Sequence, residues 1–135
     1  MIAFIVDLQD QPGELARVTE AIAQKGINIE AFSGATAGAR GAVILVTNDE
    51  EGTRRALADA GCQVKESELV TTSLEHQPGS LAAAARKLAD AGINIQGALP
   101  VGMSDGKVSV AFATDQPAKA RELIGSSEPA GIGIA

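Results

Sequence analysis

The residues with the clearest chemical potential stand in the turn DQPG, residues 10–13, just before a run with helical periodicity. Free N–H groups and the dipole at a helix start favour a carboxylate or another anion, and Gly lets another group approach the backbone closely. Asp10 can receive an ammonium group. Asn28 and Asn94 open the strands expected next in each half of the chain, and we expect their amides beside such a turn. Together these groups would hold a zwitterion. A Pro-Gly pair before a helix is also common simply as a turn that starts the helix, without any ligand.

The turn occurs twice, because the sequence contains an internal repeat with an offset of 66 residues. DQPGELARVTEAIAQKGINI at 10–29 matches HQPGSLAAAARKLADAGINI at 76–95 without a gap. Two copies are too few for a solenoid, so we predict a tandem pair of domains, 1–68 and 69–135. Units of this size lie near the lower limit for independent folding, and we expect them to share a core, a sheet or both.

Both copies show the same order of elements, and the first half of each copy is the clearest. In the first copy, residues 2–8 form an apolar, β-rich segment, and Pro12 suits the first turn of the helix that follows. Leu15, Val18 and Ile22 make one apolar stripe at helical spacing. Gly26, like Gly92 in the second copy, is placed to end the helix with a positive φ.

The rest of the first copy is expected to alternate between strands and a second helix. Strands are predicted at 27–33 and 41–47, separated by a Gly/Ala-rich loop at 34–41. Asn48-Asp49 can cap a second helix that carries Leu57. Residues 62–70 close the copy and are expected to run on into the first strand of the second copy.

The second copy shows the same order of elements, with a clearer sequence signal for its hairpin and a weaker signal for its last strand. Asp105-Gly106 is a strong hairpin signal, and Thr114-Asp115 can cap a helix that carries Leu123. The final stretch EPAGIGIA has Gly and Pro where a fourth strand belongs, so that strand is expected to be short or frayed. The order βαββαβ, twice, predicts an α+β chain of two ferredoxin-like repeats, with antiparallel strands forming a continuous sheet and helices on one face.

Composition and charge exclude several classes of function. With a net charge of −6 and 2% aromatic residues, the chain lacks the cations and stacking rings that nucleic acid requires, and it is ill-suited to an anionic membrane. The core is expected to consist of Ile, Leu, Val and Ala, with Phe4, Phe32 and Phe112 as its large rings. Cys62 is expected to be a small buried hydrophobe. One Cys and one His leave no conventional zinc set.

The sequence offers no grounds for catalysis, a cofactor or a membrane span. It has no Ser/His/Asp or Cys/His set and no phosphate loop. The opening MIAFIVD has no basic segment and reaches a charge at Asp7, which argues against a signal sequence, and no segment approaches membrane-spanning length. We therefore expect a soluble, cytoplasmic protein that is not an enzyme.

A strand, then D/N-x-P-G-x-L, a helix and G-x-N-I resembles the pattern of the ACT domain, and the resemblance covers both copies. It implies a regulatory module without catalysis that binds a free amino acid, usually at an interface between two ACT units. Homodimerisation and a regulated enzyme or regulator as partner are further implications. The resemblance places the ligand contacts in the first loop of each copy and at the start of its second strand. These positions are Asp10, Gln11, Pro12, Gly13, Glu14 and Asn28, and His76, Gln77, Pro78, Gly79, Ser80 and Asn94.

The two copies differ at one position that bears on this function. His76 stands where the ACT pattern usually has Asp or Asn; a neutral imidazole can accept from an ammonium group, and a protonated one repels it. His76 is as readily explained as a surface loop residue without a role as it is by ligand binding. One functional ligand site and one degenerate ligand site is therefore an alternative to two functional sites. The rival hypothesis for the whole chain is a protein-interaction module that pairs sheet edges and binds no small ligand.

Overall fold

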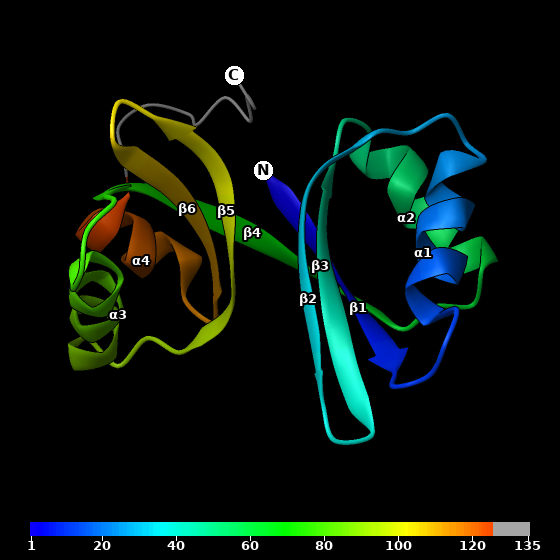
Figure 1. Cartoon of the computed structure of the whole chain (residues 1–135), viewed down its shortest axis with the longest axis horizontal. Helices are drawn as coiled ribbons and strands as arrows, with labels where there is room; N and C mark the ends of the chain where they lie inside the picture. Colours follow the sequence, from blue (N-terminus) through cyan, green and yellow to red (C-terminus); the bar gives the residue numbers. More distant parts are fainter. Residues whose placement is uncertain (126–135) are drawn as a thin grey trace. The chain divides into compact units, whose positions relative to one another are not determined.

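The computed structural model describes residues 1–125, and the chain divides into two compact units, Met1–Ser67 and Glu68–Ala135 (Figure 1). The elements of unit 1 are β1 (Ile2–Gln9), α1 (Glu14–Ala23), β2 (Ile29–Ala37), β3 (Arg40–Thr47), α2 (Glu50–Asp59) and the first part of β4 (Val64–Glu75). Those of unit 2 are the second part of β4, α3 (Ser80–Asp90), β5 (Ile95–Ser104), β6 (Lys107–Thr114) and α4 (Pro117–Ile124).

The strands follow the order β2-β3-β1-β4-β6-β5, in which each strand is hydrogen-bonded to the next. β1 and β2 pair antiparallel with β3, and β4 and β5 pair antiparallel with β6. In each unit, two helices cover one face of the strands (Figure 1). The predicted α+β, ferredoxin-like architecture is thus confirmed, and β4 is one strand that ends the first copy and begins the second. The fourth strand expected in the second copy lies outside the described residues.

Each unit has its own hydrophobic core between strands and helices. In unit 1, Phe4, Val6 and Leu8 of β1 alternate toward the helices and pack against Val18 and Ile22 of α1. In unit 2, the core consists of Val70, Ala84, Leu88, Ile93, Val110, Phe112 and Ala120. Burial of these side chains fixes the position of the first helix in each unit, and with it the turn that precedes the helix.

Two residues assigned to the core from sequence are exposed instead. Phe32 is 65% exposed and Leu15 is 47% exposed. Phe32 pairs with the buried Leu45, which places its ring on the helix-covered face, but β2 is the edge strand of unit 1. Leu15 lies in the first turn of α1, and of the three residues in the apolar stripe only Val18 and Ile22 are buried. The predicted core was therefore wrong at both positions.

The connections also differ from expectation in two places. Residues 34–41 are not a loop: β2 and β3 stay paired as far as Ala37 and Arg40, because a short turn at Gly38, with φ 75°, joins them. Asp49 caps α2 by accepting from the Gly52 N–H at 2.9 Å, as predicted. Asp115 does not cap α4; its carboxylate accepts from the Asn94 N–H at 2.9 Å instead. The predicted hairpin at Asp105-Gly106 is present, with positive φ at both residues.

Candidate functional site

The first-copy turn, residues 10–13, leaves the start of α1 open. Gly13 is the N-cap residue with φ 90°, and no side chain of the described residues caps the helix. The backbone of the turn is held by the Asp10 N–H donating to Ala39 O at 3.1 Å and the Gln11 N–H donating to Gln9 O at 3.0 Å. Because α1 begins after Gly13, Pro12 precedes the cap and does not occupy the first helical turn as expected. The N–H groups of the first turn have no helical partner, so they are available to an acceptor.

The second-copy turn, residues 76–79, repeats this backbone geometry. Gly79 is the N-cap of α3 with φ 89°, and again no side chain of the described part of the chain caps the helix. The His76 N–H donates to Gly106 O at 3.0 Å and the Gln77 N–H to Glu75 O at 2.9 Å. Pro78 is exposed in this turn, and Ser80 begins the helix. A conformation that recurs in two copies with different side chains depends on the backbone and on the left-handed Gly.

The carboxylate of Glu14 is hydrogen-bonded within its own unit. Its carboxylate accepts from the Gln9 N–H at 3.0 Å and from Arg17 Nε at 3.3 Å. Arg17 also donates to Ala60 O at 3.3 Å, so the pair links α1 to the end of α2. The hydrogen bond from the Gln9 N–H and the Arg17 guanidinium lower the pKa of Glu14. We therefore assign Glu14 to positioning of the turn; its counterparts Ser80 and Ala83 cannot form this pair in the second copy.

The lowered pKa of Glu14 predicts a specific pH dependence. A carboxyl group with a depressed folded-state pKa stabilises the fold above its unfolded pKa of about 4.3, and the contribution is lost as the pH falls through the folded-state pKa. Glu14→Gln keeps an oxygen acceptor for the Gln9 N–H but removes the charge. In thermal melts from pH 7 to pH 3, we expect the variant to melt below the wild type at pH 7, with the two melting temperatures converging as the pH falls. A difference that stays constant with pH would contradict this role.

Asn28 and Asn94 do not lie beside the turn of their own copy. In unit 1, Ile29 pairs with Thr47 at one end of the strands, whereas Gln9 and Ala37 both pair with Arg40 at the other. The turn and Asn28 are therefore separated by the length of α1, roughly 15 Å for ten residues. Unit 2 has the same arrangement, with Ile95 opposite Thr114 and the turn beyond Lys107. The expected neighbourhood within one copy was wrong, because a full helix runs between the two features.

The main chain at Asn28 and Asn94 is nevertheless held in the same way in both copies. The Asn28 N–H donates to Asn48 Oδ1 at 3.0 Å, and the Asn94 N–H donates to Asp115 Oδ1 at 2.9 Å. Both asparagine side chains are exposed, and within residues 1–125 their amides make no hydrogen bond. Asn48 and Asp115 thus fix the main chain at each asparagine, a role that sequence reasoning missed.

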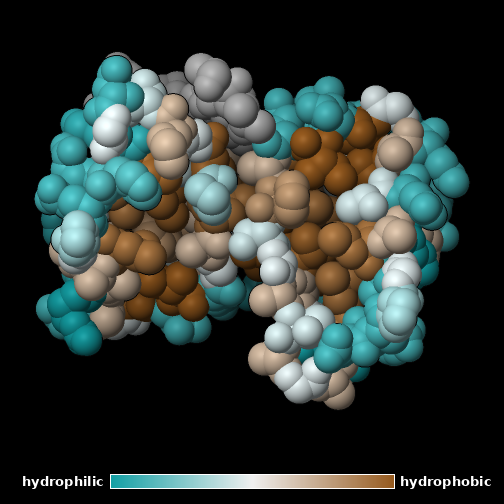
Figure 2. Space-filling model, viewed as in Figure 1, coloured by the Kyte–Doolittle hydropathy of each residue, from teal (hydrophilic) through white to brown (hydrophobic). Residues whose placement is uncertain are grey.

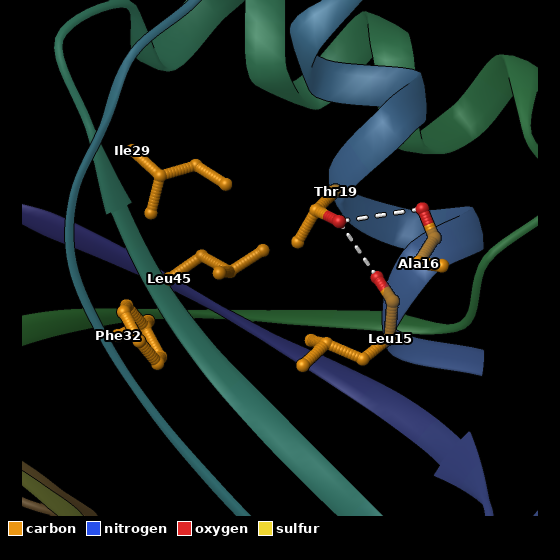
Figure 3. A pocket seen from close by; sticks show the side chains of 6 residues that line it. All are labelled: Leu15, Ala16, Thr19, Ile29, Phe32 and Leu45. Carbon is orange, nitrogen blue, oxygen red and sulfur yellow. Dashed lines mark hydrogen bonds between the residues drawn. The ribbon is translucent and has the colours of Figure 1, made fainter. Parts of the chain in front are cut away.

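A second feature that sequence reasoning missed is an apolar hollow of about 400 Å³ in unit 1. Its walls come from α1, from the edge strand β2 and from β3 (Figure 3). The residues that line this hollow are Leu15, Ala16, Thr19, Ile29, Phe32 and Leu45. Leu15 had been assigned to the core on its helical spacing, and Phe32 on its hydrophobicity. The available signal was a difference between the copies: Phe32 corresponds to Ala98 at the repeat offset.

The described residues lack two further kinds of site. Among residues 1–125, no group of three His, Cys, Asp or Glu side chains is arranged to hold a metal ion. In the same part of the chain, every helix is too short or too polar to cross a membrane. The candidate site therefore consists of two open helix starts, two exposed asparagines and one apolar hollow.

Comparison with protein families decides the assignment. A family model described as ACT domain matches residues 2–60, and one described as ACT domain pair matches residues 53–128. The chain belongs to the ACT domain family. The ACT domain pair model alone spans more than half of the chain, and the two models together include both turns and both asparagines. The resemblance inferred from the repeated motif is confirmed.

Solved structures share the fold of this tandem ACT protein. A protein from Bacteroides thetaiotaomicron is 24% identical, with a TM-score of 0.71, over 90% of this chain and 84% of that one. The ligand-free regulatory subunit of aspartate kinase from Thermus thermophilus is 20% identical, with a TM-score of 0.61, over 90% and 87%. The corresponding subunit from Thermus flavus is 22% identical, with a TM-score of 0.59, over 90% and 89%. A comparison with curated proteins gave no significant match.

Proposed function

We propose that this tandem ACT protein is a regulatory sensor that binds a free amino acid, with two ACT units contributing to the site. The observation that carries the proposal is the open helix start after a left-handed Gly, present in both copies. The N–H groups there would receive the ligand carboxylate. The ammonium group would be held by the Asp10 carboxylate and by an asparagine carbonyl.

We propose two units because the turn and the asparagine of any one unit are too far apart to contact the same small ligand. The turn and the asparagine of one unit lie at opposite ends of its strands. A ligand the size of an amino acid therefore contacts a turn and an asparagine together only when they belong to different units. We propose that the second unit belongs to a second copy of the chain, so that a homodimer would complete such a site.

The first-copy turn is the primary candidate for binding. Asp10 is exposed and carries a negative charge at the mouth of the turn, and Gln11 beside it is exposed as well. His76 in the second-copy turn is also exposed, but an imidazole carries no negative charge to attract an ammonium group. We infer that the two turns are not equivalent and that the first binds more tightly.

A regulatory role implies a recipient of the signal. The Thermus thermophilus protein of similar fold is the regulatory subunit of aspartate kinase. By analogy, we propose that this chain acts in the cytoplasm and that ligand binding alters its association with an enzyme or another regulator. A second candidate function rests on β2, an edge strand with exposed residues 34–37, which could pair with a strand of a partner protein without any small ligand.

A thermal-shift screen of the twenty amino acids separates the two candidates. A ligand that binds only the folded chain stabilises it by about 2.7 kcal/mol at a hundredfold excess over its Kd. The sensor predicts that one amino acid, or one chemical group of them, raises the melting temperature in a concentration-dependent way. If none of the twenty does so, and Asp10→Ala leaves partner binding unchanged, the interaction module is the better account.

A further inference from the structure

The apolar hollow of unit 1 adjoins the helix start at which the proposed ligand binds. Leu15 and Ala16, two of its lining residues, belong to the first turn of α1. Their N–H groups are among those that have no helical partner. One small molecule could therefore place a carboxylate at the helix start and an attached side chain toward the hollow.

The lining of the hollow is mainly apolar. Leu15 extends from α1 toward the strands, and Ile29 and Leu45 extend from β2 and β3 toward the helix (Figure 3). Thr19 donates its hydroxyl to Leu15 O at 2.9 Å and to Ala16 O at 3.3 Å, so its methyl group faces the hollow (Figure 3). Figure 2 shows hydrophobic side chains gathered between the strands and helices of unit 1. A polar side chain entering here would lose water without gaining a hydrogen bond.

Two of the residues that line the hollow have smaller counterparts in the second copy. The second-copy counterparts of Thr19 and Phe32 are the smaller Ala85 and Ala98. Leu45 corresponds in strand register to Phe112, because Phe4 pairs with Leu45 and Val70 pairs with Phe112. Leu45 is fully buried and forms the floor, while Phe32 remains 65% exposed and forms a rim. A volume of about 400 Å³ falls within the range of small-molecule sites, roughly 300–1,000 Å³.

We propose that the hollow receives the side chain of the bound amino acid, and that the ligand is therefore an amino acid with an aliphatic side chain: leucine, isoleucine or valine. This inference rests on the proposed function, because it takes the carboxylate to lie at the start of α1. Each methylene group buried contributes roughly a fourfold gain in affinity. Leucine is thus expected to bind about fiftyfold more tightly than alanine.

The test compares aliphatic amino acids with polar ones of the same shape. Titration calorimetry of the full chain with leucine against asparagine, and with valine against threonine, holds size nearly constant and changes only polarity. We expect the aliphatic member of each pair to bind at least tenfold more tightly. Two variants locate the effect: Phe32→Ala and Leu15→Ala should weaken leucine binding several-fold, because each removes part of the wall.

Leu81→Ala is the matched control, since Leu81 is the second-copy counterpart of Leu15 and is 56% exposed. It should leave leucine affinity unchanged, and all three variants should retain the far-UV circular dichroism of the wild type. If a polar or charged amino acid binds most tightly and Phe32→Ala leaves its affinity intact, the inference about the hollow is wrong while the sensor function stands. If no amino acid binds the wild-type chain, the sensor function and the inference fail together.

Discussion

Replacing Phe4 with Ala is expected to lower the free energy of unfolding of unit 1 by about 3–5 kcal/mol, the usual cost of truncating a buried phenylalanine. Phe4 is 0% exposed and packs among the side chains that hold α1 and α2 on the strands. A unit of this size has little stability to lose. Because the same core holds α1 in place, ligand stabilisation through the first-copy turn should be lost as well.

Urea unfolding measures this effect, and Phe32→Ala is its control. Phe32 is 65% exposed, so its truncation should change the free energy of unfolding by no more than about 0.5 kcal/mol. Phe4→Ala should shift the urea midpoint of unit 1 far more than Phe32→Ala does. Similar costs for the two variants would mean that the assigned core is incorrect.

Asp10→Asn is expected to weaken the binding of the amino acid ligand by about 10- to 100-fold, because a hydrogen bond to a charged group contributes about 1.5–3 kcal/mol. The substitution preserves the size of the side chain and removes only the charge that would face the ammonium group. Asp10 is exposed, so the folded state should be unaffected. Titration calorimetry with the most stabilising amino acid of the thermal-shift screen gives the ratio of dissociation constants directly.

His76→Asn is the matched substitution in the second-copy turn. Because the first-copy turn is proposed to bind more tightly, His76→Asn should change the measured affinity much less than Asp10→Asn does. A larger effect at His76 would reverse the assignment of the primary site. Equal effects would show that the two turns are equivalent, against the difference inferred here from a single residue.

Much of the fold could be predicted from the sequence because local signals agree with it. The stripe of Val18 and Ile22 places α1, and the left-handed Gly79 occurs where the repeat predicts a turn. Asp105-Gly106 forms the predicted hairpin because both residues accept positive φ. These features depend on a few neighbouring residues, which the sequence shows directly.

The errors concern properties that neighbouring residues do not determine. Phe32 has the hydrophobicity of a core residue, but its exposure depends on β2 being an edge strand, which is a property of strand order. Strand pairing across residues 34–37 likewise overrides a composition typical of loops. Asn28 lies at the opposite end of α1 from the turn at residues 10–13, and this separation in space is not evident from the sequence alone.

The central claim is that an amino acid binds at the open start of α1 together with an asparagine of another unit. The most direct measurement is a two-dimensional ¹⁵N NMR titration of the full chain with the most stabilising amino acid. The account predicts that backbone amides of residues 13–16 and the side-chain amide of Asn28 or Asn94 shift together and saturate at one ligand concentration. Saturable binding that leaves residues 13–16 unmoved, or the absence of any saturable shift, would contradict it.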